Sequence, residues 1–195
     1  MKAKGSITAI LVVLCGCALA QVNIEVLSER TALENQILGT YNSLDREMML
    51  LASVRGVDST GQIQKPPNQS QEHRDAISAI QLQTFHLDDL SVFKRLQWVG
   101  ENNVGFLKPF PMNKENVPDE LDDFAKRYTK QEFNAVITQI NTARAVIMQR
   151  VIDLNENLAQ EDLPKVQQIF GSLNAENALV GEKIQTKDSI WMVKK

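Results

Sequence analysis

His86, Asp88 and Asp89 have the side chains of a metal site. They offer one imidazole nitrogen and two carboxylates within a short stretch of this 195-residue chain, and divalent metal ions accept both kinds of ligand. The same residues are also typical of a helix end, where an aspartate accepts hydrogen bonds from free backbone amides. We favour the helix end and predict that this segment binds no metal.

Four carboxylates follow closely on one another further along the chain, at Asp119, Glu120, Asp122 and Asp123. General acid–base catalysis requires two carboxyl groups in different environments that converge on one cleft. Acids clustered at a helix start are more often a solvated face that complements the helix dipole. The sequence also lacks the nucleophile-elbow, zinc-protease, phosphate-loop and dinucleotide motifs. We therefore predict no catalytic residues, no cofactor and no enzymatic activity.

Arg144 is the charged residue that most needs explanation, because it falls close to the apolar stripe of a predicted helix. A partly buried arginine must be paired, since an unpaired buried charge costs several kcal/mol. One interpretation is an internal ion pair or carbonyl clamp that fixes the C-terminal hairpin on the helix. The other is a partner-binding site formed by Asn141, Arg144, Gly181 and Trp191, because arginine and aromatic side chains dominate protein interfaces.

Trp98, Phe106 and Phe110 are aromatic residues close together in the middle of the chain. They either belong to the core and anchor a loop, which we favour, or line an apolar groove for a lipid or peptide. The alternative function for the chain is a carrier or sensor for an apolar ligand held between the helices, which requires a cavity of some hundreds of cubic ångströms lined by apolar side chains.

Composition excludes several classes of protein. Hydrophobic residues make up 43% of the chain and charged residues 23%, which excludes a disordered or fibrous protein. Lys and Arg total 21 against 24 Asp and Glu, for a formal charge of -3. Since no basic patch stands out, we predict no nucleic-acid partner.

The N-terminal residues have the pattern of an export signal. Lys2 and Lys4 precede a nine-residue apolar run at 6–14, which is too short to span a bilayer. Leu14-Cys15-Gly16-Cys17 resembles a bacterial lipobox, so residues 1–16 are predicted to be a lipoprotein signal peptide and Cys17 the lipidated residue. The alternative is ordinary cleavage after Ala20, which leaves a soluble periplasmic protein.

Lipidation at Cys17 has consequences for location and chemistry. A diacyl anchor gives stable membrane attachment where a single chain is marginal. Ala18 rather than Asp after the cysteine favours the outer membrane of a Gram-negative cell, on its periplasmic side. Both cysteines of the chain lie in this segment, so disulfides and cysteine nucleophiles are excluded from the folded part.

The remaining chain is predicted to be mostly helical. Thr31 with Glu34 and Thr129 with Glu132 have the spacing of capping boxes that begin helices. Residues 17–128 are predicted to form an N-terminal helical region with loops at 56–70 and 100–117.

Residues 129–195 are predicted to form a helix–helix–hairpin unit that turns at Lys187-Asp188. Val22, Ile24 and Val26 give a short strand signal, which is compatible with addition to that hairpin. The predicted fold class is therefore α+β, mostly α-helical.

The C-terminal region resembles the YdbL-like family of small exported bacterial proteins, a domain of unknown function. The similarity rests on Ile140-Asn-Thr-Ala-Arg144, a second helix after Leu163-Pro164, Gly181-Glu182-Lys-Ile-Gln185 and Trp191-Met-Val-Lys194. The chain departs from the pattern at Val180, where the family often has proline, and at Asp188-Ser189-Ile190, which replaces a glycine turn. Residues 31–39 are similar to a segment of longer, lipoprotein-type members.

The resemblance implies an envelope protein without known catalytic activity. Related proteins are thought to accompany a large AsmA-like membrane protein and a small lipoprotein in envelope lipid homeostasis. We therefore expect a lipid-anchored, non-enzymatic protein that assists an envelope complex by binding another protein.

Overall fold

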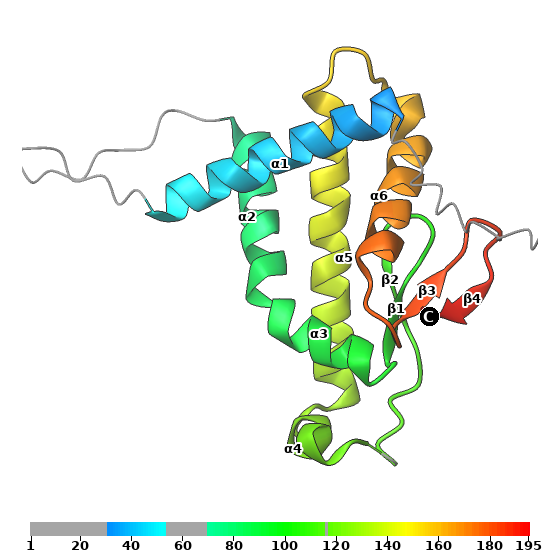
Figure 1. The fold of residues 1–195 in the computed structure, drawn as a ribbon. Coiled ribbons are helices and arrows are strands. Elements are labelled where there is room, and N and C mark those ends of the chain that lie inside the picture. The colour runs from blue at the N-terminus through cyan, green and yellow to red at the C-terminus, as the bar shows by residue number, and fades with distance from the viewer. Residues whose placement is uncertain (1–30, 54–69, 116) are drawn as a thin grey trace, which may run out of the picture.

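The computed structural model describes residues 31–53, 70–115 and 117–195. Within these ranges the chain has six α-helices and one four-stranded sheet (Figure 1), which confirms the predicted mostly helical α+β fold. The export signal, Cys17, the strand signal at 22–27 and nearly all of the predicted 56–70 loop lie outside the described residues. The helices are α1 (Ala32–Ser53), α2 (Gln71–Phe85), α3 (Leu87–Arg95), α4 (Asp119–Arg127), α5 (Lys130–Asp153) and α6 (Leu163–Asn177), and a 3₁₀ turn (Gln160–Asp162) precedes α6.

Both predicted capping boxes are present. At the start of α1, the Glu34 amide donates to Thr31 Oγ1 at 3.2 Å and the Thr31 amide donates to Glu34 Oε2 at 2.6 Å. At the start of α5, Thr129 and Glu132 make the same reciprocal pair at 3.2 and 2.8 Å. Each box satisfies amides that the first turn of a helix leaves free, so these helix starts are encoded locally.

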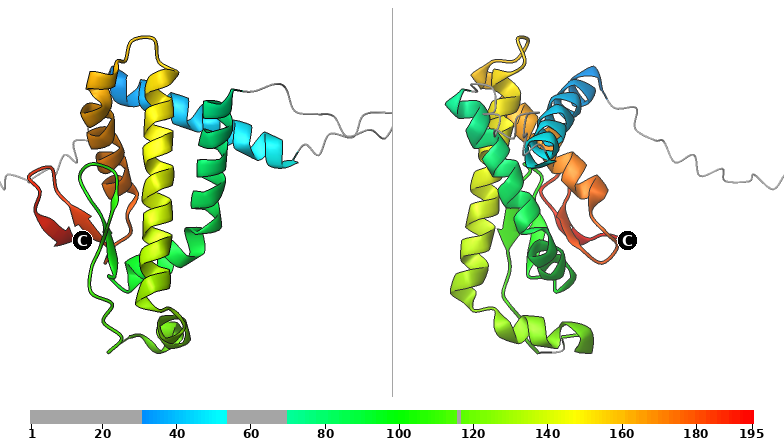
Figure 2. Two further views of the ribbon diagram at one scale, coloured as in Figure 1. Left: turned by 180° about the vertical axis from the view of Figure 1, so that it is seen from behind. Right: turned by 90° about the vertical axis from the view of Figure 1, so that its left-hand side faces the viewer.

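Helix α5 is the centre of the fold. Seen from behind in Figure 2, it stands in front of the other helices, with α2 on one side and α6 on the other. Its buried residues recur at helical spacing along its whole length, from Phe133 through Ile140 and Ile147 to Val151. This stripe packs against α2, α6 and the crossing helix α1 (Figure 1), as expected for an amphipathic helix that faces a core.

An aromatic cluster fills the end of the core nearest α4. Phe93, Trp98 and Phe133 are each at most 1% exposed. The Phe93 and Phe133 rings meet edge to face at a centroid distance of 4.9 Å, a favoured aromatic geometry. Trp98 is therefore a core residue, as we favoured over a role in a ligand groove.

The sheet consists of two short hairpins joined side by side. Its strands are β1 (Val99–Glu101), β2 (Leu107–Pro109), β3 (Lys183–Gln185) and β4 (Trp191–Val193), in the order β2-β1-β3-β4. The two hairpins are antiparallel, and the central β1–β3 pair is parallel. The prediction of a loop over 100–117 was therefore wrong for its first part, because β1 and β2 form a hairpin there. The C-terminal hairpin and its turn at Lys187-Asp188 are confirmed.

Candidate functional site

The outer strands β2 and β4 form the two edges of the sheet. An edge strand presents unpaired backbone groups, which other chains can use for strand addition. In an antiparallel pair, alternate residues of a strand direct their backbone groups toward the partner. The residues between them direct their backbone groups outward. An edge is open when these outward backbone groups have no hydrogen-bond partner, and closed when they have one.

The β2 edge is closed by an asparagine and a proline. The backbone groups of Phe106 and Phe110 bond to the β1 side, to Asn102 and Trp98, so Leu107 and Pro109 face outward. The Leu107 amide donates to Asn141 Oδ1 at 2.8 Å, and Asn141 Nδ2 donates to the Leu107 carbonyl at 2.9 Å. Pro109 has no amide hydrogen. The Asn141 carboxamide on α5 thus takes the place of a neighbouring strand.

Arg144, one turn after Asn141 on α5, holds the same hairpin through its buried charge. Its Nη1 and Nη2 donate to Glu101 Oε2 at 2.6 Å and Oε1 at 3.0 Å, and Nη1 also donates to the Gly105 carbonyl at 3.0 Å. Glu101 is 1% exposed and also pairs with Lys94 Nζ at 2.7 Å. The internal ion pair predicted for Arg144 is therefore confirmed, but it fixes β1–β2 to the helix and not the C-terminal hairpin.

Opposing effects act on the Glu101 carboxyl. Its burial favours the neutral form and raises its pKa, while the Arg144 guanidinium and the Lys94 ammonium favour the charged form. The cations prevail, and the pKa of Glu101 lies below its usual range. Glu101 is consequently ionised at neutral pH, and the cluster is a fixed set of charges.

Glu182 is a second buried carboxylate beside the same lysine. Its Oε2 lies 4.0 Å from Lys94 Nζ and accepts a hydrogen bond from the Leu179 amide at 3.1 Å. Our sequence interpretation missed Glu101, Glu182 and Lys94. A signal for the two acids was present, because one tripeptide occurs twice, as Val99-Gly100-Glu101 in the first strand and as Val180-Gly181-Glu182 directly before the third. The need of a buried Arg144 for an acidic partner was a second signal.

The β4 edge is open within the described residues. Backbone bonds of Ile190 to Thr186 and of Lys194 to Glu182 and Gly181 direct these residues toward the β3 side. By alternation, Trp191 and Val193 direct their amides and carbonyls away from the sheet. Among the described residues, no backbone or side-chain hydrogen bond covers these outward groups, in contrast to those of Leu107 on the other edge.

Exposed aliphatic side chains flank the β4 edge. Nine large hydrophobic residues are exposed in the described chain, and five of them are Leu179, Val180, Ile190, Met192 and Val193, with exposures from 40% to 78%. Leu179 and Val180 precede β3, and the other three lie at or beside β4. Exposed apolar residues gathered around a sheet edge are typical of an interaction surface. We call these five residues and the β4 backbone the β4 edge surface.

Trp191 lies on one face of the sheet at this edge. Its ring meets Phe110 edge to face at 5.0 Å, and Lys183 Nζ lies 4.2 Å from the centre of the Phe110 ring. Gly100 of β1 permits this packing, because a Cβ at position 100 would lie 2.7 Å from Trp191 Cζ3. Burial lowers the pKa of Lys183. Trp191 is half-buried. It lies next to the β4 edge but is not one of the exposed side chains there.

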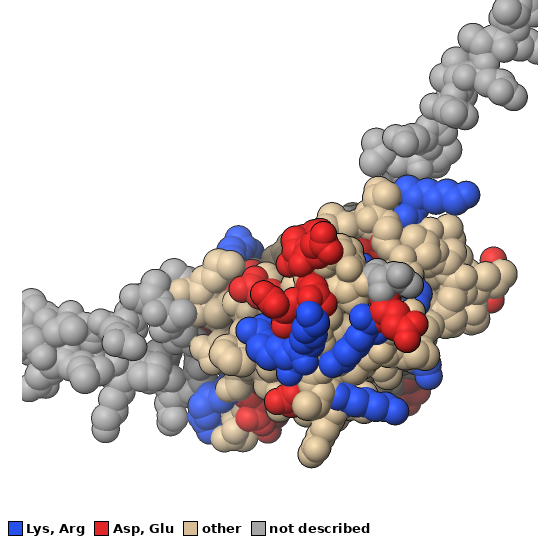
Figure 3. Space-filling view, turned by 90° about the horizontal axis from the view of Figure 1, so that it is seen from below, with Lys and Arg blue, Asp and Glu red and all other residues tan. Residues whose placement is uncertain are grey.

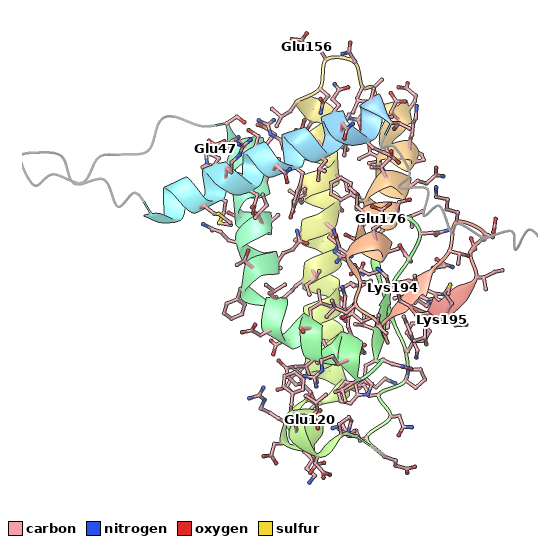
Figure 4. The ribbon with its side chains drawn as sticks, in the orientation of Figure 1. Glu47, Glu120, Glu156, Glu176, Lys194 and Lys195 are labelled. Carbon is pink, nitrogen blue, oxygen red and sulfur yellow. The ribbon has the colours of Figure 1, made fainter. Side chains whose placement is uncertain are left out.

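Gly181 and Lys194 fix the base of the hairpin. Gly181 has a φ of +94°, which favours glycine, and its amide donates to the Lys194 carbonyl at 2.9 Å. Lys194 Nζ donates to the carbonyls of Ala175 and Glu176 at 3.0 and 2.7 Å, at the C-terminal end of α6 (Figure 4). A cation there complements the negative end of the helix dipole. The β4 edge is therefore held in place by α6.

The four residues predicted as one partner site are divided between two places. Asn141 and Arg144 use their polar groups on the closed β1–β2 hairpin. Gly181 and Trp191 belong to the open hairpin, where Gly181 shapes the backbone and Trp191 adjoins the surface. We retain only the second pair as part of the candidate site.

The two acidic motifs lie in the first turns of α3 and α4, and at neither helix start does an aspartate side chain cap the backbone as a helix-end role would predict. His86 precedes α3, and its Nε2 lies 2.8 Å from Gln139 Oε1 while Nδ1 lies 3.7 Å from Asp89 Oδ2. The described residues contain no group of three or more potential metal-ligating side chains of His, Cys, Asp or Glu. In the other motif, Asp122 pairs with Lys126. Seen from below, toward the α4 end, acidic and basic side chains are interspersed (Figure 3).

Comparison with known proteins returned no relative. The chain matches no protein-family model, no curated protein and no solved structure. In the part of the chain that the structure describes, no helix has both the length and the apolar character needed to cross a bilayer.

Proposed function

We propose that this chain is a lipid-anchored, non-enzymatic protein of the bacterial envelope that binds another protein by strand addition at β4. The observation that carries this proposal is the open β4 backbone flanked by exposed aliphatic side chains. Strand addition combines main-chain hydrogen bonds with pockets for alternate side chains. The β4 edge surface offers outward main-chain groups and exposed apolar side chains for such a partner, and α6 holds it in a fixed position through Lys194.

The envelope setting rests on the sequence. The lipobox-like residues before Cys17 support an N-terminal diacyl anchor, with the outer membrane as the favoured location. The resemblance to the YdbL-like family supports a partner of the AsmA-like class or a small lipoprotein. Nucleic acid is not part of the proposal, because the net charge of the chain is -3 and acidic and basic groups are interspersed on the face of Figure 3.

Site-specific photocrosslinking in native envelopes tests the proposal. A photoreactive residue at Met192, which is 40% exposed, is compared with one at Leu154, which is 45% exposed and follows α5. We expect one abundant adduct from position 192 that position 154 does not give. Mass spectrometry of the adduct identifies the partner, and the N-terminal peptide shows whether the chain begins at a diacylated Cys17 or at Gln21.

The variant Val193→Pro distinguishes strand addition from non-specific hydrophobic binding. It removes an outward amide and leaves the inward bonds of Lys194 and Ile190 in place. We expect the adduct at position 192 to disappear in this variant. Identical adducts from both positions, an adduct that survives Val193→Pro, or a crosslink to residues 22–27 of the same chain would each contradict the proposal.

A further inference from the structure

A cleft is lined by residues of α1, α2, α5 and α6, helices whose arrangement around α5 can be followed in Figure 1. It consists of two cavities of about 180 and 230 Å³. The cavities adjoin, because they share five lining residues from four helices. These shared residues are Tyr41, Gln83, Arg144, Asn174 and Asn177. The cleft lies away from the β4 edge surface, and none of its lining residues belongs to that surface.

One end of the cleft is apolar and small. The 180 Å³ cavity is walled by Ile37, Leu38, Ile147, Phe170 and Leu173 in addition to the shared residues. A dry cavity of roughly 150 Å³ with Leu, Ile and Phe walls is large enough to bind benzene. This end therefore accommodates one aromatic ring or a short alkyl chain, and not the paired acyl chains of a membrane lipid.

The floor of the cleft offers hydrogen-bond donors. A guanidinium has five N–H groups, and within the described residues Arg144 uses three of them for Glu101 and Gly105. One N–H at Nε and one at Nη2 remain for a ligand oxygen. The amide groups of Gln83, Asn174 and Asn177 supply further donors and acceptors around the same place.

The charges of the cleft balance without a ligand. Lys94 and Arg144 are its cations, and Asp45 and Glu101 are its anions. Both cations already contact Glu101, and the lowered pKa of that carboxyl keeps it charged. An anionic ligand group would lack a free cation among the described lining residues, and burying an unpaired charge is costly. A cationic group could pair only with the partly exposed Asp45, and it could not accept the hydrogen bonds that Arg144 offers. The site therefore favours an uncharged ligand.

We propose that this cleft binds a small uncharged amphiphile. Its aromatic ring or short alkyl chain fills the apolar cavity, and its hydroxyl or carbonyl oxygens accept hydrogen bonds from Arg144 and the neighbouring amides. The inference is independent of strand addition at β4, because the two surfaces share no residue.

Three probes with one tail and different head groups test this preference. Hexyl β-glucoside is neutral, hexanoate is an anion and hexylammonium is a cation, and each is titrated into the full chain by calorimetry. We expect hexyl glucoside to bind at least about tenfold more tightly than either ion. Equal affinities, a preference for an ion, or no saturable binding of the glucoside would overturn the proposal.

Matched variants locate the binding. Leu173→Trp fills the apolar cavity and is expected to weaken glucoside binding at least about tenfold. Leu154→Trp, at a site 45% exposed and outside both cavities, is the control and leaves the affinity unchanged.

Asn177→Ala is the variant of choice if the bulky tryptophan at position 173 unfolds the protein. Asn177 is exposed at the rim of the cleft, so its truncation does not disturb the core. It removes one hydrogen-bonding group, and we expect glucoside binding to weaken about two- to tenfold. Unchanged glucoside affinity in Asn177→Ala, or in a folded Leu173→Trp protein, would overturn the assignment to this cleft.

Discussion

The two edges of the small sheet differ in whether their outward-facing backbone groups have hydrogen-bond partners. On β2, Leu107 is paired at both its amide and its carbonyl by Asn141, and Pro109 has no amide to offer. On β4, Trp191 and Val193 are the equivalent outward residues, and the described chain supplies them with no such cover. Within the described residues, one small sheet thus contains both a protected edge and an unprotected one.

The difference indicates that exposure of β4 is not a general property of a marginal sheet. Natural proteins usually protect sheet edges with proline, charged residues or a covering element, and this chain does so on β2. On β4, the outward Val193 and the adjoining Met192 and Ile190 are apolar and exposed. An edge that is apolar and uncovered, next to one that is closed, is consistent with a partner that covers it.

The largest effect is expected where the closed hairpin is tied to α5. Arg144→Ala leaves the buried Glu101 with Lys94 as its remaining cation, and loss of one partner of a buried ion pair costs about 3–5 kcal/mol. We expect that decrease in the free energy of unfolding, measured with urea. The double variant Glu101→Leu with Arg144→Met is expected to recover most of it. A single variant as stable as the parent would contradict the assigned role.

The same ion pair predicts a pH dependence. The pKa of Glu101 is lower in the folded chain than the ordinary glutamate value of about 4.3. The pair therefore stabilises the fold fully above that ordinary value, and the stabilisation is lost as the pH falls through the lowered pKa. We expect unfolding free energy to fall more steeply below about pH 4 in the parent than in the double variant. Parallel profiles would show that Glu101 is not the group responsible.

Asn141→Ala is expected to have the next largest effect, because it opens the β2 edge. The variant leaves the amide and carbonyl of the buried Leu107 without their partner, at a cost of about 1–3 kcal/mol. Hydrogen exchange of the Leu107 amide is expected to accelerate along with this loss. The neighbouring Thr142→Ala is a control on the same helix. An unchanged exchange rate in Asn141→Ala would mean that the asparagine does not close the edge.

Gly181→Ala tests the backbone at the base of the open hairpin. Space for a Cβ is open there, but φ is +94°, so strain alone is expected to cost about 1–2 kcal/mol. Gly39 in α1 also has open space and no positive φ, so Gly39→Ala is expected to stabilise the protein by about 0.5–1 kcal/mol. Thermal unfolding of both variants measures the contrast, and effects of the same sign would contradict this account.

The smallest effect on stability is expected on the open edge itself. Val193→Lys places a charge at a residue that is 41% exposed, so the free energy of unfolding is expected to change by less than about 0.5 kcal/mol. The same variant is expected to abolish the photocrosslink from position 192, because a lysine on an edge opposes strand addition. Strong destabilisation, or an undiminished crosslink, would show that β4 is not an uncovered edge.

The structural features that sequence patterns predicted well are those formed by residues close together in the chain. Capping boxes and helical periodicity depend on residues three or four positions apart, and they placed the starts of α1 and α5 correctly. The C-terminal hairpin was also predictable, since its two strands flank one turn.

The missed features depend on pairings between distant residues. Each of β1 and β2 has three residues, and Asn102, Gly105 and Pro109 gave that segment the composition of a loop. The pairing of Gly100 with Lys183 joins two separate hairpins, and no local pattern encodes it. Glu101 becomes buried only when that sheet packs on Arg144. Asn141 was therefore placed only in a candidate interface, and the internal ion pair of Arg144 was predicted without its partner Glu101.

Amide hydrogen exchange at the two edges, in the free chain and in its crosslinked complex, tests the central claim most directly. We predict fast exchange at Trp191 and Val193 in the free chain and slow exchange at both in the complex. The Leu107 amide should exchange slowly in both states, because Asn141 already pairs with it. Protection of Trp191 and Val193 in the free chain, or their continued fast exchange in the complex, would contradict the claim that β4 is an open edge that a partner covers.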